Sequence, residues 1–183
     1  MVRLISLIAL MFSFMAFGQE QYIRQGTLKA SATIAPSKML NRDANNIYLN
    51  GFIAYQLDEH LSLRGETFFY INNATSTNPI YAGAIHTYFG AFYHKGKRNW
   101  DNYLGFQPGV SVVKTAFKNN AVLPTFALKI GTAYYVWKYF HFFADLTYTN
   151  SSIRGIALDY GSMKTDELII SAGLGFQINT KKK

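Results

Sequence analysis

The sequence predicts an all-β protein, an eight-stranded antiparallel up-and-down transmembrane β-barrel, and three observations support this fold class. Runs of alternating apolar and polar residues recur along the chain, whereas helical periodicity is hard to find. Charged residues are scarce, at 15% of the chain, and aromatic residues are abundant, at 16%. Long and short connections alternate between the runs, which is typical of a barrel whose two ends differ.

The first 18 residues, MVRLISLIALMFSFMAFG, are predicted to be a cleaved signal peptide. Arg3 precedes an apolar run that extends from Leu4 to Phe17, and the small residue Gly18 suits a cleavage site. The run is shorter than the roughly 20 residues that a membrane-spanning helix needs. We therefore expect an exported protein in which residues 19–183 form one barrel domain.

Eight strands are predicted, each with one apolar face and one small or polar face. The first four, with their apolar faces, are 27–35 (Leu28, Ala30, Ala32, Ile34), 47–57 (Ile47, Leu49, Ile53, Tyr55, Leu57), 61–71 (Leu61, Leu63, Phe69, Ile71) and 80–93 (Ile85, Phe89, Tyr93). The last four are 102–114 (Leu104, Phe106, Pro108, Val110, Val112), 123–137 (Phe126, Leu128, Ile130, Tyr134, Val136), 139–149 (Phe140, Phe142, Ala144, Leu146, Tyr148) and 167–179 (Leu168, Ile170, Ala172, Leu174, Phe176, Ile178). Because proline cannot donate to a strand ladder, Pro108 beside Gly109 predicts a bulge or kink.

Charge density indicates which face of these strands is turned outward. A water-exposed strand surface would be rich in charged residues, but the polar faces here carry about one charge each. Their other residues are mostly small or amide-bearing, which suits a tight lumen. We therefore expect the apolar face to contact lipid. Six aromatic residues are expected at one membrane boundary: Tyr55, Tyr93, Trp100, Trp137, Tyr139 and Phe176.

Polar residues on the inward faces are predicted to form a network in the lumen. Its members are Lys29, Arg64, Glu66, Lys129, His141, Asp145 and Glu167. Buried charges need partners, so Lys129 is expected to pair with Asp145. Arg64 is expected to pair with Glu66 or with Glu167.

Catalysis and metal binding are not expected from the sequence. His141 and Asp145 are four residues apart on one strand face, or roughly 13 Å, which disfavours a catalytic arrangement with Ser111. The four histidines are scattered and the chain has no cysteine, so no metal-ligand spacing is present. We predict no catalytic residues, no cofactor and no metal.

The last predicted strand carries a motif. Ser171, Gly173, Phe176 and Ile178 occupy the polar, glycine, aromatic and hydrophobic positions of the insertion signal of small outer-membrane barrels. With this motif and the architecture of residues 26–179, the chain resembles the eight-stranded outer-membrane β-barrel family that includes the transmembrane domain of outer membrane protein A and the X-type proteins. Many family members end on an aromatic residue, whereas this chain continues to three lysines.

The resemblance implies a place in the outer membrane of the Gram-negative cell envelope. It also implies contact with outer-membrane lipid and lipopolysaccharide, and insertion by the barrel-assembly machinery. The net charge of +8 forms no clustered basic face, so nucleic acid is not expected as a partner.

The expected role is structural or adhesive, acting without catalysis through the outer loops and chiefly through residues 150–166. Three alternatives stay open at this point. They are a narrow pore for small solutes, an outer-leaflet lipid-modifying enzyme, and a soluble lipocalin-like carrier. Eight strands enclose little more than their own side chains, which limits the width of any pore.

Overall fold

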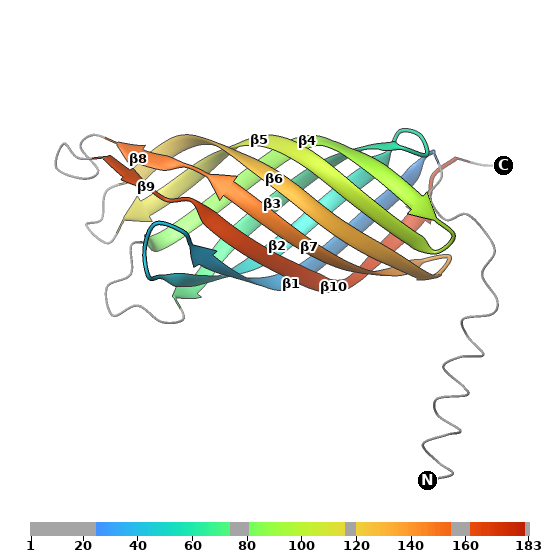
Figure 1. Cartoon of the computed structure of the whole chain (residues 1–183), viewed down its shortest axis with the longest axis horizontal. Coiled ribbons are helices and arrows are strands. Elements are labelled where there is room, and N and C mark those ends of the chain that lie inside the picture. The colour runs from blue at the N-terminus through green and yellow to red at the C-terminus, as the bar shows by residue number, and fades with distance from the viewer. Residues whose placement is uncertain (1–24, 74–80, 116–119, 155–161, 182–183) are drawn as a thin grey trace, which may run out of the picture.

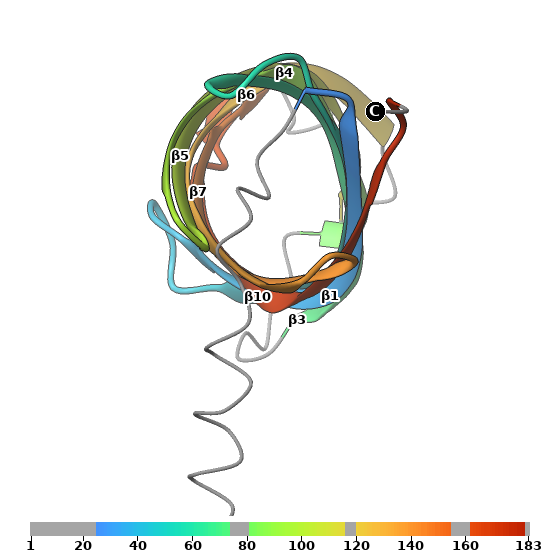
Figure 2. The same ribbon diagram turned by 90° about the vertical axis from the view of Figure 1, so that its right-hand side faces the viewer.

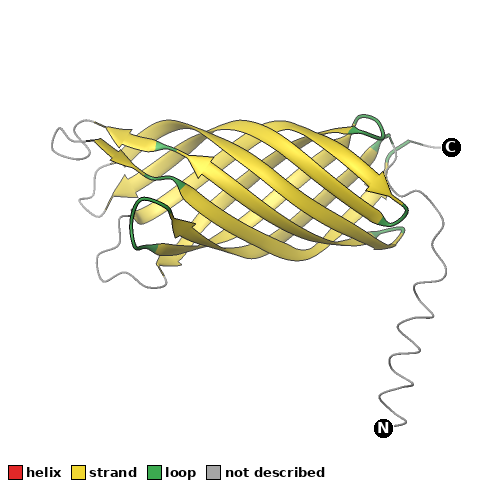
Figure 3. Cartoon of the chain, in the orientation of Figure 1, coloured by secondary structure: helices red, strands yellow, loops and turns green. Residues whose placement is uncertain are grey.

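The chain forms a closed antiparallel β-barrel (Figures 1 and 3). The computed structural model describes residues 25–73, 81–115, 120–154 and 162–181. Within them, the barrel strands are β1 (Thr27–Met39), β2 (Asn45–Gln56), β3 (Leu61–Asn73), β4 (Tyr81–Lys97), β5 (Trp100–Thr115), β6 (Asn120–Trp137), β7 (Phe140–Asn150) and β10 (Glu167–Asn179). Each pairs with the next along the chain, and β10 pairs with β1. The predicted eight-stranded up-and-down barrel is confirmed, while the predicted signal peptide lies outside the described residues.

The two ends of the barrel differ, as the alternating connection lengths predicted. Short turns at residues 57–60, 98–99 and 138–139 join β2 to β3, β4 to β5 and β6 to β7. The first strand, β1, begins at this turn end, and the last strand, β10, finishes there (Figure 1). The opposite, loop end carries a separate two-stranded sheet of β8 (Ser152–Arg154) and β9 (Ser162–Lys164). The sequence had predicted only a loop there, and residues 155–161 lie outside the described part.

Several strands are longer than predicted and longer than a membrane requires. A transmembrane strand needs about 9–11 residues, whereas β5 has 16 residues and β6 has 18. Compared with the prediction, β5 gains Trp100 and Asp101 at the turn end and Thr115 at the loop end, and β6 gains residues 120–122 at the loop end. The wall formed by β4, β5 and β6 therefore has strands longer than a bilayer crossing requires.

The strands turn their apolar side chains outward, as expected. Burial alternates residue by residue along β7 and β10, with the predicted apolar set on the exposed side. All eight barrel strands contribute exposed large apolar side chains, among them Phe89 at 60% and Leu104 at 57%. Figure 2 shows the strands as a closed ring around the lumen. A continuous apolar surface of this extent would be a liability in water, and it is what a lipid-facing band requires.

The six aromatic residues predicted at one membrane boundary lie together at the turn end, all on the outer surface. We call them the aromatic rim. Their rings contact one another and the neighbouring strands: Tyr139 stacks on Phe176 with 6.2 Å between ring centroids. Trp100 lies 4.9 Å from Tyr134 by the same measure. Tyrosine and tryptophan favour the membrane–water boundary because their rings are apolar and their tips polar. This aromatic rim therefore marks one edge of the lipid-facing band.

The sequence predicted a bulge or a kink at Pro108, and the bulge is wrong. β5 keeps one register with β4 on both sides of the proline, pairing Gly109 with Tyr88 and Phe106 with Ala91. It also pairs without a shift with β6, where Pro108 faces Phe126. Only the pairing of β4 with the stretch around Pro108 is interrupted, because proline has no N–H to donate. Gly90 lies opposite, and a side chain there would collide with the carbonyl oxygen of Phe106.

The seam between β1 and β10 is also interrupted. Paired residues run from Thr27–Asn179 to Ser31–Gly175 and resume at Ser37–Ile169 in the same register. Between these points two hydroxyl groups donate to carbonyl oxygens of β10: Ser31 Oγ to Leu174 at 3.1 Å and Thr33 Oγ1 to Ala172 at 2.7 Å. Side-chain hydroxyls thus substitute for part of the backbone ladder at the closing joint.

We predict that backbone amide hydrogens at this seam exchange with solvent faster than those elsewhere in the barrel wall. Those backbone amides of residues 32–35 and 170–174 that point across the seam should exchange with solvent deuterium faster than those of the uninterrupted β5–β6 ladder, because ladder hydrogen bonds protect amides from exchange. Hydrogen–deuterium exchange of the detergent-refolded protein measures this. Equal protection of the seam and of β5–β6 would contradict it.

Candidate functional site

The inward faces of the strands bring a set of charged side chains into the lumen. All seven residues of the predicted network are buried there, none more than 6% exposed: Lys29, Arg64, Glu66, Lys129, His141, Asp145 and Glu167. They come from five strands, and the two-residue period of a strand points them all inward. They do not form one network, however, but three separate groups along the barrel axis.

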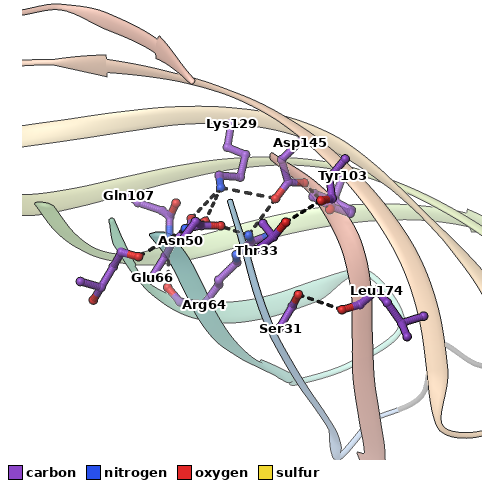
Figure 4. A network of polar contacts seen from close by, with 12 residues as sticks. Ser31, Thr33, Asn50, Arg64, Glu66, Tyr103, Gln107, Lys129, Asp145 and Leu174 are labelled. Carbon is purple, nitrogen blue, oxygen red and sulfur yellow. Dashed lines mark hydrogen bonds and ion pairs between the residues drawn. The ribbon is translucent and has the colours of Figure 1, made fainter. Parts of the chain in front are cut away.

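Four of these residues cross the middle of the lumen as a balanced group of two cations and two carboxylates (Figure 4). Arg64 Nη2 lies 2.9 Å from Glu66 Oε1 and 2.8 Å from Asp145 Oδ2. Lys129 Nζ lies 2.6 Å from Glu66 Oε2 and 3.4 Å from Asp145 Oδ2. Each charge therefore has two opposite partners, which offsets the cost of removing it from water. We call Arg64, Glu66, Lys129 and Asp145 the central charge group.

Neutral groups complete this arrangement. Tyr103 Oη donates to Asp145 Oδ1 at 2.5 Å, and Asn50 Nδ2 donates to Glu66 Oε1 at 2.9 Å. The guanidinium of Arg64 lies over the ring of Phe52, 3.6 Å from its centroid, a cation–π contact. The central charge group is therefore held from several strands at once and fills the cross-section it occupies.

Glu167 belongs to a second group nearer the loop end and does not pair with Arg64. Its carboxylate accepts hydrogen bonds from Ser37 Oγ at 2.8 Å, Asn46 Nδ2 at 3.1 Å and Tyr48 Oη at 2.9 Å. These donors lie on β1 and β2, next to β10 across the closing seam. Glu167 thus helps to join the last strand to the first two.

An apolar cluster fills the lumen at the loop end. It consists of Met39, Ala44, Ala84, Val113 and Leu123, all buried. These residues lie near the loop-end limits of β1, β2, β4, β5 and β6. Packed apolar side chains therefore occupy the lumen near the loop end.

The third polar group lies at the turn end, and the sequence analysis missed most of it. Lys29 Nζ donates to Tyr135 Oη at 2.5 Å and lies 3.5 Å from Asp101 Oδ2. Asp101 also contacts His94 Nδ1 at 2.9 Å, and His94 Nε2 contacts Ser62 Oγ at 2.7 Å. Predicting that the fifth strand began at residue 102 left Asp101 out of its inward face. The two-residue period, extended by one step from Tyr103, would have included it.

His141 behaves differently from its neighbours. Its ring packs against Tyr135 and Phe143, and its Nδ1 has no hydrogen-bond partner among the described residues. No hydrogen bond joins it to Asp145 within the part of the chain that the structure covers. Ser111, which the sequence analysis weighed as a nucleophile, instead contacts His86 Nδ1 at 2.7 Å.

The motif of the last strand is divided between the two faces of β10. Ser171 is fully buried in the lumen, and Gly173 faces inward toward Thr33 and Phe143. Phe176 and Ile178 are exposed on the outer surface at the turn end. The described residues contain no cluster of three or more histidine or acidic residues able to hold a metal ion. No helix within them could cross a membrane.

Comparison with solved structures places this fold among known barrels. The N-terminal β-barrel domain of Pseudomonas aeruginosa OprF is similar, with a TM-score of 0.56 and 16% identity over 84% of this chain and 98% of that chain. Pseudomonas aeruginosa OprG has a TM-score of 0.57 and 14% sequence identity, covering 86% of this chain and 98% of that chain. Neisserial surface protein A has a TM-score of 0.57 and 15% sequence identity, covering 84% of this chain and 96% of that chain. No family model matches the sequence. No curated protein matches it either.

The chain therefore has the fold of the small eight-stranded outer-membrane β-barrels, with an exposed apolar band around the barrel. The exposed apolar band suits contact with lipid. The soluble carrier alternative is therefore overturned, because the apolar faces are outside and the charged groups inside.

We predict that the central charge group stabilises the barrel only while it is complete. Replacing Glu66 with glutamine leaves Lys129 and Arg64 each short of a carboxylate, so the free energy of unfolding should fall by about 3–5 kcal/mol. Urea unfolding of the refolded protein, followed by tryptophan fluorescence, measures this. The matched control is Glu59→Gln in the exposed turn, expected within about 0.5 kcal/mol of the unsubstituted protein. Equal stability of the two variants would contradict the prediction.

Proposed function

We propose that the protein is a non-conducting outer-membrane scaffold with a structural or surface-interaction role. The observation that carries this proposal is the filled lumen. The central charge group spans it, the Glu167 group and the apolar cluster follow toward the loop end, and the turn-end cavity has a volume of only about 20 Å³. That volume holds about one water molecule. A scaffold role needs no catalytic step.

The loop end supports a role at the cell surface. In outer-membrane barrels the short turns face the periplasm and the longer connections face outward. Here the long strand β6 begins at the loop end, and the β8–β9 sheet at this end lies within the 150–166 stretch that the sequence favoured for interaction. What this end contacts would then be outside the cell or in the outer leaflet.

Exposed cations at the loop end favour lipopolysaccharide as a partner. Lys38, Arg42, Lys114 and Lys164 are all exposed there, with Asp43 as an exposed acid beside them. Cations of this kind attract the phosphate groups of an anionic lipid surface. We extend the proposal to lipopolysaccharide contact through these four residues.

The motif on β10 supports insertion by the barrel-assembly machinery. Phe176 and Ile178 present apolar side chains outward near the chain's end, while Ser171 and Gly173 keep the inward side small. A partner that approaches the strand from the membrane would meet both features before the seam with β1 closes.

Conductance tests the closed lumen. The refolded protein should give no steady single-channel steps in a planar lipid bilayer, because packed side chains occupy the lumen. Changing Arg64, Glu66, Lys129 and Asp145 together to serine removes all four charges and most of the plug, and should produce brief openings. A heat-dependent shift in gel mobility verifies that both proteins are folded. Regular steps from the unsubstituted protein would make it a pore.

Thermal unfolding tests the lipopolysaccharide contact. Lipopolysaccharide added to phospholipid vesicles should raise the unfolding temperature of the protein, because a ligand that binds only the folded state stabilises it. Changing Lys38, Arg42, Lys114 and Lys164 to glutamine should remove most of this rise. The matched control changes four exposed cations of the turn end: Lys95, Lys97, Arg98 and Lys138. An equal loss in both sets would contradict a loop-end contact.

A further inference from the structure

The turn-end group contains a continuous chain of hydrogen bonds from a serine through a histidine to a carboxylate. Ser62 Oγ lies 2.7 Å from His94 Nε2, and His94 Nδ1 lies 2.9 Å from Asp101 Oδ2 and 3.0 Å from Oδ1. An ionised carboxylate can only accept, so Nδ1 carries the proton that it shares with Asp101. Nε2 is then the acceptor for the hydroxyl proton of Ser62. This is the order of groups that activates a serine nucleophile.

Local structure explains how residues far apart in the sequence reach this arrangement. Ser62 and Asp101 are each the second residue of their strand after a short turn, on β3 and β5. His94 lies on β4 between them, and its backbone N–H donates to the carbonyl oxygen of His60 at 2.7 Å. The three side chains therefore share the lumen layer directly behind the turns. Spacing along the sequence gave no sign of this, because the barrel register creates it.

The carboxylate of this chain is itself fixed in place. Tyr135 Oη donates to Asp101 Oδ2 at 3.1 Å, and Lys29 Nζ approaches the same oxygen at 3.5 Å. A carboxylate held in this way keeps the imidazole in one tautomer and stabilises the imidazolium that forms when it takes a proton. Asp101 therefore has the features of a positioning residue.

A small cavity adjoins the serine. Ser62 and His94 line it together with Arg64, His141 and aromatic rings. The Arg64 Nε–H is buried and has no hydrogen-bond partner within the described residues. Arg64 follows Ser62 by two positions on the inward face of β3, so its donor belongs to the same cavity wall. A buried donor left without a partner is unusual, and a donor of this kind suits an oxygen that gains negative charge.

From this geometry we infer that Ser62 is the nucleophile of an acyl-transfer site that hydrolyses small acyl esters. The cavity holds about one water molecule, so we restrict the proposal to acetyl esters, which enter when the side chains that line the cavity move apart. This activity goes beyond the scaffold role and does not depend on it. The leaving alcohol would depart by the turn end, which lies directly beyond this layer.

Ser62 Oγ attacks the carbonyl carbon while its proton passes to His94 Nε2, and the resulting oxyanion accepts from Arg64 Nε. The carbon–oxygen bond to the alcohol then breaks, and the alcohol oxygen takes the proton back from His94. Water adds to the acyl-serine with His94 again as base. Release of the carboxylic acid restores the serine hydroxyl.

The test uses the full chain refolded in detergent, with p-nitrophenyl acetate as the probe. We expect p-nitrophenolate release by the folded protein, with an acetyl group found on Ser62 by mass spectrometry after a quench. Ser62→Ala should lower the rate by about 100-fold or more. Asp101→Asn should lower kcat with KM unchanged, because it alters the imidazole tautomer rather than the cavity.

The chain supplies a matched control. Ser111 also contacts a buried histidine, His86, at 2.7 Å, but neither residue lines the cavity. Ser111→Ala should therefore keep the full rate. A heat-dependent gel shift shows whether each variant is folded.

Cysteine variants keep the inference testable if Ser62→Ala does not fold. The thiol of S62C should react with iodoacetamide faster than the thiol of S111C, because His94 favours the thiolate. The inference is overturned if Ser62→Ala releases p-nitrophenolate as fast as Ser111→Ala, if no acetyl group is found on Ser62, or if the two thiols react alike.

Discussion

Closure of the hydrogen-bonded ladder is the constraint on which the rest of this structure depends. In lipid every backbone polar group must find its partner within the protein, and a sheet achieves this only by joining its last strand to its first. Here β10 meets β1, and the joint is incomplete in the middle of the wall. Ser31 and Thr33 hydroxyls and the Glu167 carboxylate, which binds donors from β1 and β2, reinforce it. The first and last strands are thus held together partly by side chains.

Closure with eight strands leaves a lumen that side chains must fill. The outward faces are mostly apolar, so most polar side chains of the strands are turned into this narrow space and must be satisfied there. Three polar groups in separate layers and an apolar cluster at the loop end occupy this space. The same requirement brings Ser62 and Asp101 into contact with His94. The central charge group and the Ser62–His94–Asp101 chain therefore have the same physical origin.

The sequence was sufficient to predict which strand residues face outward, but not which side chains pair with one another inside the lumen. Alternation along β10 fixed which of its residues face lipid, because a period of two assigns a face to every residue at once. Partners inside the lumen depend on register and on the direction in which each side chain leans. Arg64 was expected beside Glu66 or Glu167, and the structure gives it Glu66 and Asp145. His94 looked isolated in the sequence because its partners lie on other strands.

The central claim is that the outer surface contacts lipid while the charged groups are sealed inside. The chain's two tryptophans, Trp100 and Trp137, report on it directly, since both lie on the outer surface at the turn end, 52% and 60% exposed. Refolding into vesicles of lipids brominated near the headgroup should quench their fluorescence strongly, and lipids brominated at the chain ends should quench it less. Fluorescence that neither lipid quenches, but that a water-soluble quencher does, would contradict this account.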